Sequence, residues 1–430
     1  MDEGGRMNEA SVAPGMKGFP HGQAAAVRLD DVAAKGWNVL AGDLPLPIAI
    51  VKREALAHNI AWMQQQARTW GIDLAPHGKT TMSPRLFRRQ LDAGAWGLTF
   101  ATVTQLAVGV AAGARRTVIA NQVLADADLA GIQALLRAHP GLRIVFLVDS
   151  PAQLGLIEAW SEAHAGALPF EVLLEIGVAG GRTGCRTPAE AAALARHLHA
   201  SDSVRLVGIE CYEGLGAKGN TEDDAPYAKA LMDRVESIAR LCDAEHLFDA
   251  DEVLLSAGGS AIFDLVATRL KPTLGRPLRG LLRSGCYVTH DHGFYKRFVN
   301  VVNQRCGCDE GLRPALEVWA TVQSQPEPGL AILAVGRRDL SFDIELPIPI
   351  ARAARGARTP SASPASWRIT GLNDQHAYLR WDGADAASAP AVGERIGLGI
   401  SHPCTTFDKW QWMPIVDDDY RVVDALVTHF

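Results

Sequence analysis

Short apolar runs alternate with longer stretches of helical period between about residues 48 and 290. The runs are rich in β-branched residues and the longer stretches in Ala and Leu, a pattern typical of strand–helix units around a parallel sheet. Helical candidates include residues 84–93, 152–164, 188–199 and 225–242. Eight runs read as strands: residues 73–79, 97–102, 117–121, 143–148, 170–177, 205–213, 252–259 and 279–288. Eight units are the number that closes a (β/α)8 barrel of the TIM type.

Local signals mark where the first of these helices begins and ends. Ser83-Pro84 offers an N-cap followed by proline at the first helical position, and Gly94 stands where a left-handed residue commonly ends a helix. We therefore expect the first strand to end near Lys79. An open doubly wound sheet is the alternative, but no GxGxxG sequence opens the first helix and no P-loop sequence occurs, which disfavours a nucleotide-binding fold.

The pattern changes after about residue 310 to shorter alternating runs, which predict a mostly antiparallel β domain. The candidate strands are residues 315–322, 329–334, 341–346, 366–370, 376–381 and 395–400. Residues 351–366 are rich in Ala, Arg, Ser and Pro and predict an exposed loop. We expect an N-terminal segment of residues 1–47 partly packed on the β domain, a barrel of residues 48–305 and a β domain of residues 306–430.

Composition narrows the class of protein. The chain has 430 residues, 48% of them hydrophobic, and a net charge of −6, which excludes a disordered, collagenous or coiled-coil protein. Its basic residues are scattered, so a nucleic-acid partner is not expected. Seven cysteines without an export signal indicate reduced thiols, and no apolar stretch is long enough to cross a membrane. We expect a cytoplasmic protein that acts on small molecules.

Candidate chemistry gathers at the predicted carboxyl ends of the strands, where barrel enzymes place their active sites. Lys79, with His77 beside it, could attack a cofactor aldehyde, although a solvated lysine is the more common case. Gly258, Gly259 and Ser260 would let backbone N–H groups and a hydroxyl approach a phosphate, although a tight turn is the simpler interpretation. An aldehyde site and a phosphate site together fit pyridoxal phosphate, which carries both groups on one ring.

A second signal is the pair His402 and Cys404. Two positions apart in an extended stretch, their side chains face the same way and could hold one metal ion, for which imidazole and thiolate favour zinc. A buried thiol beside an ordinary histidine is the simpler alternative. Two ligands would leave positions open for water or substrate, as in catalytic sites. Cys306 and Cys308 have the same spacing but are interpreted as unrelated thiols at the domain junction.

Six ordered motifs give the chain a family resemblance. They are residues 76–81 (Pro-His-Gly-Lys-Thr-Thr), 175–184, 208–214 (Gly-Ile-Glu-Cys-Tyr-Glu-Gly), 256–260 (Ser-Ala-Gly-Gly-Ser), 283–288 (Arg-Ser-Gly-Cys-Tyr-Val) and 402–404 (His-Pro-Cys). Over roughly residues 45 to 415 the chain resembles the D-serine dehydratase and D-threonine aldolase family, pyridoxal-phosphate enzymes of the alanine-racemase fold type. The resemblance implies a pyridoxal-phosphate barrel followed by a metal-binding β domain.

The resemblance also implies roles for individual residues. Lys79 would form the covalent bond to the cofactor aldehyde beside His77, and Arg182 and Tyr212 would contact the cofactor ring or its phenolic oxygen. The phosphate of the cofactor would bind Gly258, Gly259 and Ser260, with Tyr287 close by. A divalent metal would bind His402 and Cys404; zinc is expected first, with manganese or magnesium as alternatives.

The chain departs from the family pattern at two places. Thr81 and Met82 stand where the family often has His-Lys, which removes an imidazole and a positive charge near the lysine. The glycines before Arg182 are also spaced more loosely than in the family, so the sequence leaves open which group Arg182 contacts.

The resemblance favours one reaction over several alternatives. The metal-binding pair resembles His-x-Asp in the aldolase branch of the family and His-x-Cys in the dehydratase branch. Cys404 therefore favours a dehydratase, which would convert D-serine, D-threonine or D-threo-3-hydroxyaspartate to a 2-oxo acid and ammonia. Retro-aldol cleavage, racemisation and a non-enzymatic role as a pyridoxal-phosphate carrier are the alternatives. Family members also resemble homodimers, in which the cluster at residues 410–413 could pack, although such a cluster is more often core.

Overall fold

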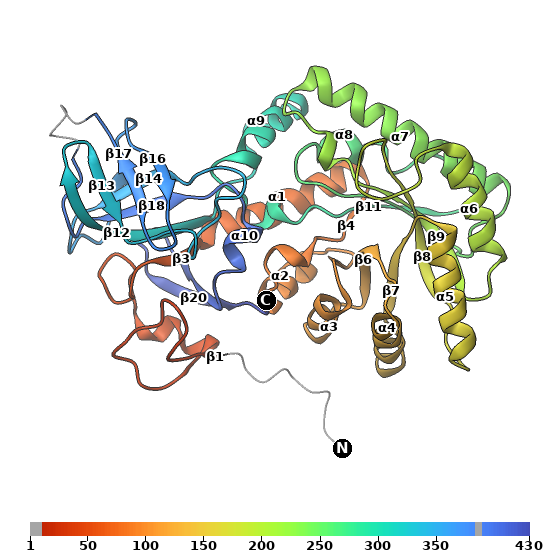
Figure 1. Ribbon diagram of the computed structural model, residues 1–430, viewed down its shortest axis with the longest axis horizontal. Coiled ribbons are helices and arrows are strands. Elements are labelled where there is room, and N and C mark those ends of the chain that lie inside the picture. The colour runs from red at the N-terminus through yellow and green to blue at the C-terminus, as the bar shows by residue number, and fades with distance from the viewer. Residues whose placement is uncertain (1–10, 383–388) are drawn as a thin grey trace.

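Eight parallel strands form the first sheet of the structure, a computed structural model that describes residues 11–382 and 389–430 (Figure 1). The sheet order is β4-β11-β10-β9-β8-β7-β6-β5. The strands are β4 (Asp73–Leu74), β5 (Leu98–Phe100), β6 (Arg116–Gln122), β7 (Arg143–Val148), β8 (Phe170–Ile176), β9 (Val204–Cys211), β10 (Val253–Ala257) and β11 (Leu278–Leu282).

Backbone hydrogen bonds link the two edges of this sheet. The N–H of Trp96 donates to the carbonyl of Leu74 at 2.8 Å, and the N–H of Thr99 donates to that of Pro76 at 2.9 Å. Each of the eight observed strands overlaps one of the eight runs that the hydrophobic pattern picks out. The predicted (β/α)8 barrel is confirmed.

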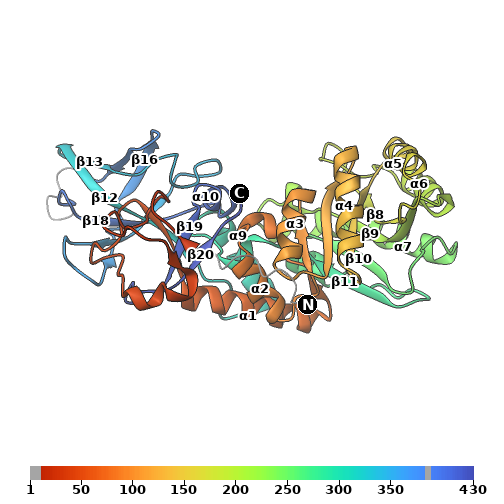
Figure 2. The same ribbon diagram turned by 90° about the horizontal axis from the view of Figure 1, so that it is seen from below.

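Helices surround the barrel, and Figures 1 and 2 show them on the outside of the sheet. They are α1 (Arg53–Trp70), α2 (Pro84–Asp92), α3 (Val103–Ala111), α4 (Asp126–Ala138), α5 (Pro151–Ala163), α6 (Pro188–Ala200), α7 (Thr221–Ala244), α8 (Phe263–Ala267) and α9 (Phe294–Cys306). Alternate strand residues face opposite ways. Val145 and Leu147 belong to a small cluster inside the barrel, whereas Phe146 belongs to the large cluster under the helices.

The start of α2 confirms part of its predicted cap. The helix begins at Pro84, and Gly94 has the positive φ of +106° expected after its last turn. Ser83 occupies the expected N-cap position, but its hydroxyl is buried and makes no hydrogen bond to the helix N–H groups. Proline at the first helical position, rather than a side-chain cap, therefore marks this helix start.

The second sheet is antiparallel for the most part, as predicted. Its main path runs β15-β14-β18-β12-β13-β17-β16, and β3 joins β12 to the hairpin β19–β20. The strands are β3 (Ile48–Lys52), β12 (Leu316–Glu327), β13 (Leu330–Leu333), β14 (Ile348–Ala353), β15 (Ser361–Ala362), β16 (Arg368–Leu372), β17 (Ala377–Arg380), β18 (Arg395–Gly399), β19 (Trp412–Val416) and β20 (Val422–Val427). β3 is parallel to β19 and antiparallel to β12.

Three expectations for this region are wrong in detail. Residues 48–52 were expected in the barrel, but they form β3 and pair with β12 and β19 in the second sheet. Residues 351–366 were expected as a loop, yet they include the end of β14 and all of β15. Residues 341–346 form no strand. Hydrogen bonds to side chains of residues 401–406 hold that backbone, as when the N–H of Ser341 donates to Thr406 Oγ1 at 3.0 Å.

The N-terminal segment packs on the second sheet. It contains β1 (Ser11–Val12) and β2 (Val27–Arg28), and the 3₁₀ turns η1 (Leu29–Asp31) and η2 (Ala33–Lys35). Trp412 Nε1 donates to the carbonyl of Lys17 at 2.9 Å, and the N–H of Val39 donates to that of Tyr420 at 3.0 Å. Trp410 and Trp412 are both buried in this chain, so the aromatic cluster is core. Within the described residues, no helix is both long and apolar enough to cross a membrane.

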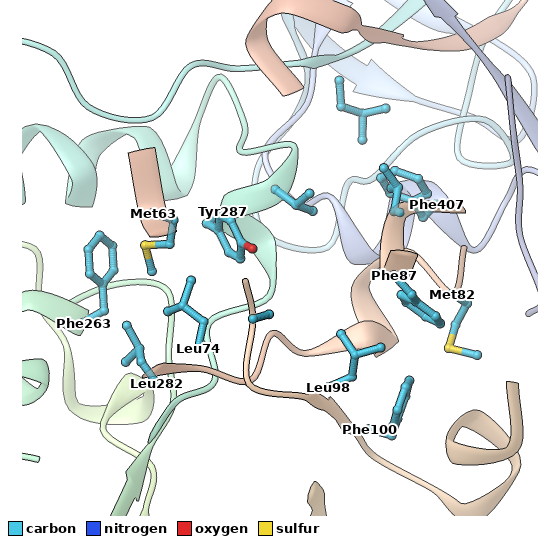
Figure 3. Packing of buried hydrophobic residues seen from close by; sticks show 14 of the residues in the cluster. Met63, Leu74, Met82, Phe87, Leu98, Phe100, Phe263, Leu282, Tyr287 and Phe407 are labelled. Carbon is cyan, nitrogen blue, oxygen red and sulfur yellow. The ribbon is translucent and has the colours of Figure 1, made fainter. Parts of the chain in front are cut away.

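The two lobes meet where α10 (Cys404–Phe407) packs against the 3₁₀ turn η3 (Gly78–Thr80). Figure 3 labels Phe407 of α10 and Phe87 of α2, and both side chains belong to the large hydrophobic cluster. Phe407 and Phe87 are fully buried. This contact brings the His402 and Cys404 segment to the end of the first barrel strand, where Lys79 lies.

Candidate active site

Lys79 lies in η3, directly after the first barrel strand. Regular pairing stops at Leu74, and Pro76 has no N–H to continue it, so the chain turns into one turn of 3₁₀ helix. Gly78 packs so tightly that a Cβ there would lie 2.6 Å from the Phe100 ring. The neighbours of Lys79 in the turn are buried while its own side chain is exposed. Packing of this turn therefore presents a single amine at the barrel mouth.

His77 stands beside that amine with a buried ring nitrogen. Its Nδ1 has no hydrogen-bond partner among the described residues, and its backbone forms a bridge to Thr99 of β5. Burial, together with the positive charges of Lys79 and Arg283, lowers the pKa of His77 well below its usual value. The imidazole is therefore neutral near pH 7, and its unsatisfied nitrogen is an observation that fits a polar ligand bound at this place.

A buried ion pair lies under the barrel mouth. Arg283 Nη2 donates to Glu210 Oε2 at 2.6 Å and to the carbonyl of Cys211 at 3.2 Å, and Nη1 donates to Ser256 Oγ. Both charged side chains are at most 3% exposed. Burial raises the pKa of Glu210, and the adjacent guanidinium opposes that shift. The pair ties together the ends of β9, β10 and β11, from which the neighbouring site residues project.

The predicted phosphate turn has room only for glycine. A Cβ on Gly258 would lie 2.7 Å from Arg283 Cβ, and one on Gly259 would lie 2.5 Å from Glu213 Oε1. Neither carboxyl oxygen of the buried Glu213 has a hydrogen-bond partner among the described residues, and burial raises its pKa to about 7. With Ser260 following, the turn is a cradle that side chains would fill, so these residues fit a phosphate group.

Arg182 and Tyr212 meet at the mouth of the barrel, and the cofactor contacts that the resemblance implies for them stay a prediction. The guanidinium of Arg182 lies over the Tyr212 ring, 4.6 Å from its centroid, and both residues line a small cavity with Thr183. Burial raises the pKa of the Tyr212 phenol. Arg186 holds the loop that carries Arg182, since its guanidinium donates to four backbone carbonyls of residues 181–184.

Tyr287 lies deeper than the other expected cofactor contacts. It belongs to the turn η5 (Cys286–Val288), and it packs among Met63, Leu74 and Leu282 in the large hydrophobic cluster (Figure 3). Its hydroxyl oxygen accepts a hydrogen bond from Gln90 Nε2 at 3.0 Å, and burial raises its pKa. The structure thus assigns the phenol to the core, and its contact with a phosphate stays a prediction.

His402 and Cys404 lie together on the β-domain side of the mouth. The Nδ1 atom of His402 lies 2.6 Å from Asp343 Oδ2, and Thr405 Oγ1 donates to Asp343 Oδ1 at 2.7 Å. Burial by itself would lower the pKa of His402, but its contacts with Cys404 and Asp343 raise it to about 9. An imidazole, a thiol and a carboxylate that orients the imidazole form a donor set that fits a zinc-type ion.

Cys286 is the neighbour of this pair that the sequence did not single out for a role. Its Sγ atom lies 3.6 Å from that of Cys404, and Thr80 Oγ1 lies 3.4 Å from Cys404 Sγ. Through Thr80 the pair is one residue away from Lys79. No group of three or more His, Cys, Asp or Glu side chains is already arranged to hold a metal ion in the part of the chain that the structure describes.

Tertiary contacts identify four further residues that sequence reasoning missed: Glu213, Arg186, Asp343 and Cys286. Glu213 and Cys286 stand inside the motifs at residues 208–214 and 283–288, so their position at strand ends was the available signal. No signal in the sequence pointed to Asp343, because its contact with His402 joins residues that are 59 positions apart.

Comparison with known proteins gives two matching families. The family described as "Alanine racemase, N-terminal domain" matches residues 51–277, and the "Putative serine dehydratase domain" matches residues 315–416. A D-threonine aldolase from Arthrobacter sp is 27% identical over 84% of this chain and 86% of its own. A D-threo-3-hydroxyaspartate dehydratase from Delftia sp. (strain HT23) is 30% identical over 84% of this chain and 92% of its own.

A solved structure shows the same fold. It is a D-threo-3-hydroxyaspartate dehydratase in which one cysteine is replaced by alanine, described as the metal-free form. The TM-score is 0.70 with 24% identity, over 91% of this chain and 99% of that one.

Proposed function

Since the chain belongs to the family of pyridoxal-phosphate enzymes that contains D-threonine aldolase and D-threo-3-hydroxyaspartate dehydratase, we propose that it is a metal-assisted dehydratase of D-β-hydroxy amino acids. The substrate would be D-serine, D-threonine or D-threo-3-hydroxyaspartate. Water is lost between Cα and Cβ and is returned when the resulting imine is hydrolysed, so the net products are a 2-oxo acid and ammonia.

Each residue at the barrel mouth has a separate role in the proposed reaction. When bound, pyridoxal phosphate supplies an electron sink for the pair released at Cα, and a divalent metal supplies a Lewis acid for the departing β-hydroxyl. Gly258, Gly259 and Ser260 would hold the phosphate through backbone N–H groups and a hydroxyl. Lys79 would hold the cofactor covalently, and its Nζ would take the α-proton of the bound substrate. Neutral His77 lines the site without adding a positive charge.

The observation that carries this proposal is the place of Cys404. Its thiol lies 3.4 Å from the hydroxyl of Thr80, the residue after Lys79, so a metal held by His402 and Cys404 would lie against the turn that carries the reacting amine. Hydroxide is a poor leaving group, and a metal at that place would lower the barrier to its loss.

Retro-aldol cleavage is the second candidate, because the related aldolase is nearly as similar as the dehydratase. An aldolase would use the same metal to orient and deprotonate the β-hydroxyl, so that the Cα–Cβ bond breaks and glycine leaves. Position 404 is cysteine in this chain, whereas the corresponding position of the aldolase branch resembles aspartate, and this difference favours dehydration. Racemisation would need a second base on the opposite face of the cofactor.

A substrate panel tests the reaction. D- and L-serine, D- and L-threonine and D-threo-3-hydroxyaspartate are incubated with the holoenzyme, with and without zinc, manganese or magnesium. Products are scored separately as 2-oxo acid, glycine with aldehyde, and inverted amino acid. We expect 2-oxo acid from D-substrates in a metal-dependent reaction. Glycine and aldehyde from D-threonine, with no 2-oxo acid from D-serine, would establish the aldolase instead.

A Lys79→Ala variant tests the cofactor attachment separately. It should lose turnover together with the visible absorbance of the covalently bound cofactor. Its far-ultraviolet circular dichroism, which reports secondary structure, should stay unchanged. A non-enzymatic carrier would keep bound cofactor after chelation and would show no turnover on any substrate.

We also propose a homodimer, consistent with four partly exposed apolar side chains near the mouth. They alternate along one segment, from 37 to 42% exposed: Phe342, Ile344, Leu346 and Ile348. Asp343 of the same segment contacts His402, so a second subunit that covers these side chains would lie close to the metal pair. Sedimentation of the wild-type protein and of a Phe342→Ser/Ile344→Ser variant tests this arrangement.

A further inference from the structure

A second thiol, that of Cys286, faces the Cys404 thiol at the proposed metal pair. Cys286 follows the last barrel strand in η5, is 6% exposed, and has its Sγ atom 3.6 Å from Cys404 Sγ. The two residues are 118 positions apart and come from different lobes. Both thiols are free in the structure. The mechanism proposed above uses only Cys404, so the function of Cys286 is unassigned.

Packing fixes Cys286 in this position. Gly285 precedes it, and a Cβ there would lie 2.7 Å from both the His77 carbonyl and Thr80 Oγ1. Glycine therefore lets η5 pack directly against the turn that carries Lys79. The Cys404 thiol contacts the same Thr80 hydroxyl at 3.4 Å. Cys286, Cys404 and Thr80 thus form one contact group beside the reacting lysine.

The sulfur separation matches that of two thiolates on one metal ion. Two zinc–sulfur bonds of about 2.3 Å at a tetrahedral angle place the sulfurs about 3.8 Å apart. A disulfide would need the sulfurs at about 2.05 Å, far closer than they are. The observed 3.6 Å is near the first value.

We propose that Cys286 is a third protein ligand of the catalytic metal, together with Cys404 and His402. This inference rests on the metal-dependent function proposed above and adds to it a ligand and a metal preference. Two thiolates and one imidazole leave a fourth tetrahedral position for water or the substrate hydroxyl, the arrangement of catalytic zinc sites. Soft thiolates select zinc over magnesium or manganese, which prefer oxygen donors.

Binding requires one adjustment of the side chains. Since no three such side chains are preassembled around an ion in residues 11–382 and 389–430, the imidazole and the pair of sulfurs must come closer together when the metal binds. The contact between Asp343 and Nδ1 leaves Nε2 as the atom that can bind. The two sulfurs need almost no movement.

Cobalt substitution counts the thiolate ligands directly. Holoenzyme carrying Cys306→Ser and Cys308→Ser, which removes the two accessible thiols near the end of α9, is stripped of metal and titrated with Co²⁺. Thiolate-to-cobalt charge-transfer absorption grows with the number of sulfur ligands. Cys286→Ala in this background should lose about half of that absorption, and its Kd for zinc should rise at least about tenfold. Cys242→Ala, which removes a buried thiol of α7, is the matched control and should change neither quantity.

Several outcomes would overturn the proposal. Unchanged cobalt absorption and zinc affinity in Cys286→Ala would show that Cys286 is no ligand. Loss of two titratable thiols in the untreated protein, restored by reductant only when Cys286 is present, would show a disulfide instead. X-ray absorption of the unmutated zinc protein should find two sulfur ligands, and one sulfur would reject the proposal even if the variants fail to fold. Glycine and aldehyde as products with two sulfurs on the metal would reject the dehydratase and leave the ligand assignment intact.

Discussion

Asp343 orients His402 through a hydrogen bond of 2.6 Å between its Oδ2 atom and the imidazole Nδ1. Thr405 fixes the other carboxylate oxygen at 2.7 Å, so the carboxylate is held at both ends. A histidine whose Nδ1–H donates to a carboxylate presents Nε2 as an acceptor, which is the tautomer that a metal requires. The residues that set the metal site therefore extend beyond the His402 and Cys404 pair.

Replacing Asp343 should weaken the metal without removing a ligand. An Asp343→Asn variant should raise the Kd for zinc roughly 10- to 100-fold, the usual effect of losing an outer partner of a ligating histidine. Chelator competition measures the Kd, and Asp408→Asn at the end of α10, with an exposed carboxylate, is the matched control. An Asp343→Asn variant with wild-type zinc affinity would show that the carboxylate does not orient the ligand.

A methyl group at Gly258 should damage the cofactor cradle. The added Cβ would lie 2.7 Å from Arg283 Cβ, and the buried ion pair to Glu210 prevents that arginine from moving away. We expect Gly258→Ala to lower the affinity for pyridoxal phosphate at least about tenfold, measured by equilibrium dialysis of the stripped protein. The matched control is Gly155→Ala, because a Cβ at Gly155 in α5 meets nothing within 4 Å. That control should gain roughly 0.5–1 kcal/mol of stability.

The buried ion pair should respond asymmetrically to the loss of either partner. Glu210→Ala leaves the guanidinium of Arg283 buried without its carboxylate, which should cost about 3–5 kcal/mol of unfolding free energy. Arg283→Met leaves a carboxyl group whose pKa burial already raises, so it can take a proton and lose its charge. At pH 7 the second variant should therefore be less destabilised in guanidinium unfolding. The opposite order would contradict this account.

Asp291 should make stability fall as pH rises. It accepts backbone hydrogen bonds from Gly293 and Tyr295 at the start of α9, and burial raises its pKa to about 7. Between about pH 4 and 7 the folded state keeps a proton that the unfolded state has lost, so unfolding free energy decreases by up to ~1.4 kcal/mol per pH unit. Above pH 7 this contribution is constant.

An Asp291→Asn variant isolates that contribution. Asparagine keeps an oxygen for the N–H of Gly293 but does not titrate in this range. Its melting temperature should fall less between pH 5 and pH 7.5 than that of the wild type, and exposed Asp418→Asn should behave like the wild type. Parallel profiles for wild type and Asp291→Asn would rule out Asp291 as the source.

Local chemistry made much of the barrel predictable. The eight runs, Pro84 at a helix start and Gly94 after its end depend on periodicity and on the conformational limits of single residues, and both are present in the sequence. Gly258 and Gly259 were predictable for the same reason, since only glycine permits the close approach seen there. β3 was assigned to the wrong lobe, because an apolar run does not specify which strand it pairs with.

The sequence by itself determined the alternation of strands and helices, the place of Lys79 after the first barrel strand, the glycine turn and the His402 and Cys404 spacing. Only the tertiary structure decided that Asp343 contacts His402, that His77 has an unsatisfied buried nitrogen, and that Cys286 lies against Cys404. The physical reason is the range of the interactions. Propensity and spacing act over a few residues, whereas the Asp343–His402 and Cys286–Cys404 contacts join residues 59 and 118 positions apart. The second of these contacts forms where η5 and α10 both pack on the lysine turn.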